Sequence, residues 1–145
     1  RAFLKAQMGA GNILPTEGAV FISIRDEDKT PQMVEAASLL SGMGFQLVAT
    51  AGTAAFLSQN DIPCERVKKV YEGRPNVVDL MKDGGVQLVL NTTEGAASVA
   101  DSREIRSVAL YDKIPYYTTA AGAHATALAM KAREEGELVV KPLQA

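Results

Sequence analysis

Short apolar segments alternate along this chain with segments whose apolar residues recur at helical spacing. Residues 18–25 read GAVFISIR, a β-branched and aromatic run that is typical of a buried strand. Between Val34 and Met43 the apolar residues then return every three or four positions, as they do on a helix that packs with one face. This order of strand and helix recurs along most of the chain. It predicts an α/β fold in which helices cover both faces of a parallel sheet.

The same patterns place the remaining elements. Further strands are expected over residues 45–50, around residues 65–67, over residues 86–90 and 114–117, and as a last short strand at Val139-Val140. Further helices are expected over residues 54–59, 77–82, 96–110 and 120–134. Thr30 is expected to cap the first helix, because Pro31 is well suited to the first helical position that follows it.

Composition limits the function classes. With 145 residues, of which 47% are hydrophobic, the chain suits one domain with a buried core. A net charge of −2 gives no positive field for nucleic acid, so no nucleic-acid partner is expected. No apolar run approaches the roughly 20 residues of a membrane span, and no membrane association is expected. A single cysteine, Cys64, excludes an internal disulfide and suits a cytoplasmic protein.

Residues 1–15 are interpreted as the end of an upstream helix and a linker, left from a longer protein, so that the domain itself spans residues 16–145. Residues 2–8 read AFLKAQM, which suits the last turns of a helix. Glycine at Gly9 and Gly11, followed by Pro15, is a helix stop signal. The alternative is the trimmed N-terminus of a small free-standing protein.

Polar residues that can bind an anion follow four of the expected strands. The carboxyl ends of parallel strands meet at one edge of a sheet, where ligands bind. Ala51, Gly52 and Thr53 begin a helix, whose free N–H groups and dipole favour an anion, and Gly52 permits close approach. The lysines would supply positive charge and the threonines O–H donors. The residues at these strand ends are Ser23, Lys29, Thr50, Thr53, Lys69, Asn91 and Thr93.

This set is cationic and hydroxylic and has no obvious acid–base partner. Each residue alone is better explained as a helix cap or a solvated surface group, but their occurrence at successive strand ends favours a phosphate site. His124, inside an expected helix, and Cys64, which has no histidine near it in the sequence, are interpreted as structural. The sequence has no Cys/His cluster at metal-ligand spacing and no P-loop motif. No catalytic residue, metal or cofactor is therefore expected in this domain.

Several segments resemble the methylglyoxal-synthase-like domain that ends the large subunit of carbamoyl-phosphate synthetase. The resemblance runs in order through most of the chain and includes Lys5-Ala6-Gln7 near its start. EGRPN, NTTEG and DSREIR are specific in combination, although each alone is weak. The matching segments are residues 23–29, 44–54, 70–76, 91–95 and 101–106.

The resemblance implies a three-layer, Rossmann-like sandwich with a five-stranded parallel sheet. It implies a regulatory, non-catalytic domain that binds the inhibitor UMP, and in some members IMP. Contacts to the effector phosphate would fall on Lys29, Thr50, Thr53, Lys69, Asn91 and Thr93, with Ser23, Ala51 and Gly52 close to the effector. In members activated by ornithine, Tyr116 and Thr118 would face the ornithine site.

The resemblance also implies a parent enzyme, a ligase. It would make carbamoyl phosphate from glutamine, bicarbonate and ATP for arginine and pyrimidine biosynthesis. Its ATP sites, with Mg²⁺ or Mn²⁺ and K⁺, would lie in regions outside this chain. The partners would be the rest of the large subunit and the small glutaminase subunit, and a homo-oligomer is left open.

Three alternatives remain. Methylglyoxal synthase, which removes phosphate from dihydroxyacetone phosphate, is similar at Lys29 and at residues 49–53, but it needs a carboxylate base where this chain reads EGRPN. The cyclohydrolase part of the bifunctional purine enzyme starts similarly, but its lysine- and histidine-bearing motif is missing. The third alternative is an interaction domain without a ligand. Ala51 stands where some family members have histidine, which leaves the effector preference open.

Overall fold

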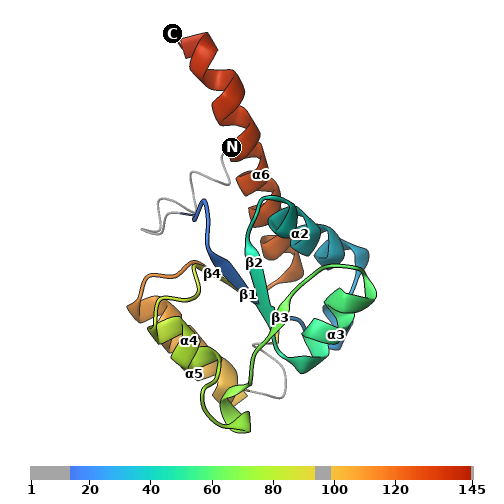
Figure 1. The fold of residues 1–145 in the computed structure, drawn as a ribbon, viewed down its shortest axis with the longest axis vertical. Helices are drawn as coiled ribbons and strands as arrows, with labels where there is room; N and C mark the ends of the chain where they lie inside the picture. The colour runs from blue at the N-terminus through green and yellow to red at the C-terminus, as the bar shows by residue number, and fades with distance from the viewer. Residues whose placement is uncertain (1–13, 94–98, 145) are drawn as a thin grey trace.

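The computed structural model describes residues 14–93 and 99–144 (Figure 1). Its strands are β1 (Ala19–Ser23), β2 (Gln46–Ala49), β3 (Glu65–Arg66), β4 (Leu88–Asn91) and β5 (Tyr116–Tyr117). Its α-helices are α2 (Pro31–Gly42), α3 (Ala51–Gln59), α4 (Val77–Lys82), α5 (Val99–Tyr111) and α6 (Ala120–Gln144). Two short 3₁₀ helices, η1 (Asp26–Asp28) and η2 (Val70–Glu72), lie in the loops.

The five strands form one parallel sheet in the order β3-β2-β1-β4-β5. From β1 the chain builds outward to β2 and β3, and it then returns to the other side of β1 with β4 and β5. The crossovers that follow β1 and β4 therefore leave in opposite directions. Ser23 and Asn91, the last residues of these two strands, are register partners. Such a switch point opens a crevice at the carboxyl ends of the strands.

Each face of the sheet has its own buried core, because successive strand residues point to opposite faces. Val20 and Ile22 of β1 pack in a cluster with α2, α3 and α6. Phe21, which lies between them, packs in a second cluster with α4 and α5. Figure 1 shows α2 with α6, and α4 with α5, on opposite sides of the strands. The predicted three-layer α/β sandwich with a five-stranded parallel sheet is confirmed.

Several local expectations can be compared with the structure. Thr30 caps α2 and Pro31 occupies its first turn, as predicted, although the Thr30 side chain makes no capping hydrogen bond. The predicted strand at Val139-Val140 is wrong, because α6 continues through these residues to Gln144. Two β-branched residues lower helix propensity only slightly and do not end a helix that is already formed. The first three residues of the helix expected over residues 96–110 lie outside the described residues.

The predicted upstream segment is described only at its end, since residues 1–13 lie outside the described residues. Leu14 is 2% exposed and belongs to the core beneath α2 and α6. The guanidinium group of Arg133, on α6, donates hydrogen bonds to the carbonyl oxygens of Leu14 and Pro15 at 2.9 and 2.6 Å. These contacts fix the start of the described chain against α6. Within the described ranges, no helix combines the length and the apolar character that a bilayer crossing requires.

Candidate anion-binding site

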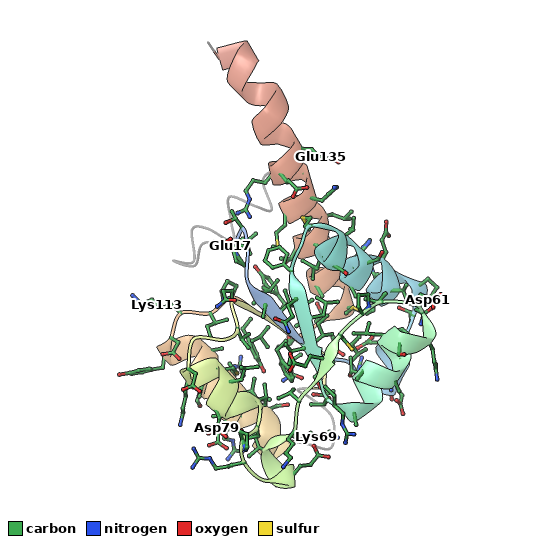
Figure 2. All side chains as sticks on the ribbon, viewed as in Figure 1. Glu17, Asp61, Lys69, Asp79, Lys113 and Glu135 are labelled. Atoms are coloured by element: carbon green, nitrogen blue, oxygen red, sulfur yellow. The ribbon has the colours of Figure 1, made fainter. Side chains whose placement is uncertain are left out.

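A cavity of about 190 Å³ opens where the strands end. It is lined from the carboxyl end of β1, the loop before α2, the start of α3, the segment after β3 and the segment after β4. Figure 2 shows Lys69 past the carboxyl end of β3, at the edge of the sheet where the strands end. The structure therefore brings together most of the residues that were predicted from strand ends. The predicted residues that line the cavity are Ser23, Lys29, Thr50, Gly52, Thr53, Lys69 and Thr93.

Two lysines are among the described residues that line the cavity. The side chain of Lys29 is 25% exposed, and its Nζ donates to Oδ1 of Asp26 at 2.9 Å. The same Nζ lies only 3.6 Å from the point that a Cβ on Gly52 would occupy, so it sits beside the start of α3. The hydrogen bond from Lys29 holds the pKa of the Asp26 carboxyl below its usual range. Lys69, from the segment after β3, also lines the cavity.

The N-terminus of α3 also faces the cavity. Thr50 is the N-cap, but its side chain accepts no hydrogen bond from the first turn. The first backbone bond of the helix runs from the Ala54 N–H to the Thr50 carbonyl at 2.7 Å. The Thr50 side chain therefore leaves the earlier N–H groups of the turn unsatisfied, and the positive end of the helix dipole points the same way. Gly52 and Thr53, in this turn, line the cavity and make it suitable for an anion.

Hydroxyl groups fix the loops around the cavity to one another. The backbone N–H of Ile24 donates to Thr53 Oγ1 at 2.9 Å, which ties α3 to the end of β1. The backbone N–H of Arg25 donates to Thr92 Oγ1 at 3.1 Å, and the N–H of Thr92 donates to the Ser23 carbonyl at 2.9 Å. The segment after β4 is thereby held against the segment after β1. These hydrogen bonds between backbone groups and hydroxyl groups hold the loops around the cavity in a fixed arrangement.

Four predicted residues lie outside the cavity lining. Asn91 is fully buried behind Thr93, and Ala51 is half-buried at the start of α3. Tyr116 lies in β5, and Thr118 is exposed just after it. Asn91 Nδ2 donates to the Tyr116 hydroxyl at 3.1 Å. The assignment of Tyr116 and Thr118 to an ornithine site stays a prediction.

Part of the cavity lining does not come from the strand ends and was not predicted from the sequence. Ser102 and Ile105 of α5 line the cavity, and a spacing of three places them on one face of the helix. Phe21, Ile24, Val70 and Val77 add an apolar part. The DSREIR segment contains both Ser102 and Ile105, but nothing local in it indicates which of its residues face the sheet edge.

Two residues that were interpreted as structural lie away from the cavity lining. His124 Nε2 and Glu35 Oε1 are 2.8 Å apart and connect α6 to α2. Cys64 is half-buried, and burial raises the pKa of its thiol, so the reactive thiolate is disfavoured. In the described parts of the chain, no three histidine, cysteine or acidic residues are grouped so that they could hold a metal ion.

The strands form a parallel sheet of order β3-β2-β1-β4-β5, and lysines and hydroxyl groups line a cavity at the strand ends. The chain is therefore an α/β domain with a candidate anion-binding site at the carboxyl edge of its sheet. The chain belongs to the MGS-like domain family, whose sequence pattern matches residues 32–118. The family resemblance drawn from the sequence segments is thus confirmed.

Carbamoyl phosphate synthase large chains are among the curated relatives of this chain. The chain is 50% identical over 143 residues to that of Rhizobium meliloti (strain 1021) and 48% identical over 143 residues to that of Myxococcus xanthus (strain DK1622). It is 52% identical over 130 residues to that of Pseudomonas aeruginosa. These matches cover 99%, 99% and 90% of this chain but only 12%, 13% and 12% of the relatives. The chain therefore spans about an eighth of their length.

Replacing Gly52 by alanine is expected to raise stability and weaken anion binding. An alanine in this helical turn should add about 0.5 kcal/mol to the free energy of unfolding. Its methyl group would lie 3.6 Å from Lys29 Nζ, in space that an anion would share. Urea unfolding and phosphate titration of the same variant measure the two effects. Unchanged phosphate affinity in a stabilised Gly52→Ala variant would show that the anion does not approach this turn.

Proposed function

We propose that the chain is the regulatory, effector-binding domain of a carbamoyl-phosphate synthase large chain. We further propose that its cavity binds the phosphate of a nucleoside monophosphate, UMP or IMP. Similarity to large chains along nearly the whole sequence supports the parent enzyme. The lining of the cavity supports the ligand class.

The observation that carries the ligand proposal is that Lys29 and Lys69 line the same cavity as the start of α3. Lys29 and Lys69 supply positive charge, and the first turn of α3 supplies N–H groups. Sites for drug-sized ligands usually measure about 300–1,000 Å³. A cavity of about 190 Å³ therefore suits a phosphate and the atoms next to it. Val70, Val77 and Ile105 offer an apolar surface for the sugar or the base.

The same lining argues against a lyase. Proton abstraction next to a carbonyl requires a base whose pKa lies near the working pH. Among the described residues that line the cavity, the carboxylate is Asp26, whose side chain is 92% exposed and whose pKa is lowered by Lys29. Asp26 is therefore a weak base. We accordingly propose that the chain is a binding domain without catalytic residues, metal or cofactor of its own.

We also propose the activity of the parent enzyme. This enzyme would make carbamoyl phosphate from glutamine, bicarbonate and ATP, with Mg²⁺ or Mn²⁺ and K⁺, for arginine and pyrimidine biosynthesis in the cytoplasm. The rest of the large chain and the small glutaminase subunit would be its partners. An effector would act by favouring one global state of the enzyme, and the substrates would in turn change the effector's affinity. Tyr116 and Thr118 are proposed to face ornithine in an activated enzyme.

Calorimetry with UMP, IMP, inorganic phosphate and uridine tests the proposal. UMP should bind at least about tenfold more tightly than uridine, since uridine lacks the group that the lysines contact. Equal affinities for UMP and uridine would contradict a phosphate site. Dihydroxyacetone phosphate serves as the enzymatic control, and its conversion to methylglyoxal by the chain would replace the sensor proposal with the lyase.

A further inference from the structure

Two threonine hydroxyls of the cavity differ in how their protons are engaged. Thr53 Oγ1 accepts a hydrogen bond from the Ile24 backbone, so its own proton is left to donate. The Thr93 hydroxyl instead donates to Oδ1 of Asn91. It therefore presents lone pairs to other partners, although the sequence had suggested an O–H donor at this position. The hydroxyl groups of Thr53 and Thr93 thus have opposite hydrogen-bonding character within one cavity lining.

The buried amide of Asn91 determines this difference, and its orientation follows from its neighbours. The backbone N–H of Thr93 lies 3.3 Å from the Asn91 oxygen, and an N–H group can only donate. The oxygen must therefore face Thr93. The amide nitrogen then faces Ser102 Oγ at 3.3 Å and the Tyr116 hydroxyl at 3.1 Å, which both accept. Since an amide oxygen only accepts, the Thr93 hydroxyl must give it its proton.

The direction of the Thr93 hydroxyl also determines the hydrogen bond of Ser23, at the end of β1. Its Oγ lies 3.4 Å from Thr93 Oγ1, and either atom could in principle donate. The single proton of Thr93 is already directed to Asn91, so Ser23 supplies the proton of this pair. Ser23 and Thr93 both line the cavity. The part of the cavity lining that comes from the ends of β1 and β4 consequently offers acceptor oxygens.

We propose that Asn91 acts as a specificity-determining positioning residue, which makes this side of the cavity a hydrogen-bond acceptor. The site then favours a ligand that brings an O–H group together with its negative charge. An oxyanion without a proton would meet the remaining lone pair of Thr93 and the lone pairs of Ser23, and it would leave them without a partner. The O–H group can come from a protonated phosphate oxygen or from a sugar hydroxyl. This inference rests on the proposed function, since it requires that the cavity binds an anion.

The first arm of the test compares inorganic phosphate with sulfate by calorimetry on the whole chain at pH 8. Both ions are tetrahedral and doubly charged there, but hydrogen phosphate keeps one proton and sulfate has none. Phosphate is expected to bind at least about tenfold more tightly, because a site built to hydrogen-bond an O–H group rejects an analogue that lacks it.

The second arm compares UMP with its 2′,3′-dideoxy form at the same pH. A preference for phosphate over sulfate identifies a phosphate O–H as the donor of the inorganic ion. The monoester phosphate of UMP carries no proton at pH 8, so the donor of UMP must be a sugar hydroxyl. A preference for UMP over the dideoxy form, without the first preference, identifies the sugar. If phosphate binds no more tightly than sulfate, and UMP no more tightly than its dideoxy form, the cavity has no acceptor side and the inference is wrong. If neither phosphate nor sulfate nor UMP binds, the proposed function itself fails, which is a distinct result.

Three variants separate positioning from mere structural support. Asn91→Ala frees the Thr93 proton, so the preference that the native chain shows, for phosphate over sulfate or for UMP over its dideoxy form, should fall toward a ratio of one. Thr93→Val removes the acceptor and should lower the ratio in the same way, and it serves if the Asn91 variant fails to fold. Lys69→Ala, the control, should weaken both anions and leave the ratio unchanged. If Asn91→Ala and Thr93→Val lowered the affinities but left the native preference unchanged, the two residues would be structural supports only.

Discussion

Replacing Lys69 by alanine is expected to weaken the binding of UMP, IMP and inorganic phosphate by roughly ten- to a hundredfold. A charge-assisted hydrogen bond to phosphate has an energy of about 1.5–3 kcal/mol, and Lys69 is one of the two lysines that line the cavity. All phosphate-bearing ligands should lose affinity alike, since the contact is to the group they share. Isothermal titration calorimetry at fixed ionic strength measures the loss.

The neighbouring lysine provides a matched control for this prediction. Lys68 is exposed, precedes Lys69 in the chain and is not part of the cavity lining. Lys68→Ala removes the same charge from almost the same place, so it should change affinity by much less. Equal losses in the two variants would indicate a general effect of net charge. An unchanged affinity in Lys69→Ala would remove this residue from the site.

Replacing Leu40 by alanine is expected to lower the free energy of unfolding by about 2–5 kcal/mol. Leu40 is 0% exposed and lies in the core that joins α2 and α6 to the sheet. The loss combines the removed apolar contacts with the cavity that the truncation leaves. The midpoint of urea unfolding should fall, and its slope should stay the same.

Leu128, on α6, provides the control for this core substitution. It is 43% exposed, so Leu128→Ala should cost about 1 kcal/mol or less. A similar loss in both variants would contradict the placement of Leu40 in the core. Near-normal stability of the Leu40→Ala variant would contradict it more directly.

The architecture could be predicted because each helix and strand has its own pattern of apolar residues in the sequence. The strand over residues 86–90 and the helix over residues 77–82 are apolar runs of suitable length and period, and the structure has β4 and α4 there. Strand alternation with helices then leaves a parallel sheet as the consistent arrangement. The error at Val139-Val140 arose where two β-branched residues were too few to decide between strand and helix.

The candidate site was predictable as far as it depends on where strands end. Lys29, Thr53 and Lys69 follow different strands, and a parallel sheet brings such positions to one edge. The position of Asn91 depends instead on contacts with Ser102 and Tyr116, which are distant in the sequence. For the same reason, no local pattern could show that the Thr93 hydroxyl donates to Asn91 rather than to a ligand.

A crystal structure of the chain with UMP bound tests the central proposal most directly. The phosphate should lie within hydrogen-bond distance of the Lys29 and Lys69 ammonium groups and of the first N–H groups of α3. A nucleotide whose phosphate binds elsewhere, with both lysines directed into solvent, would contradict it.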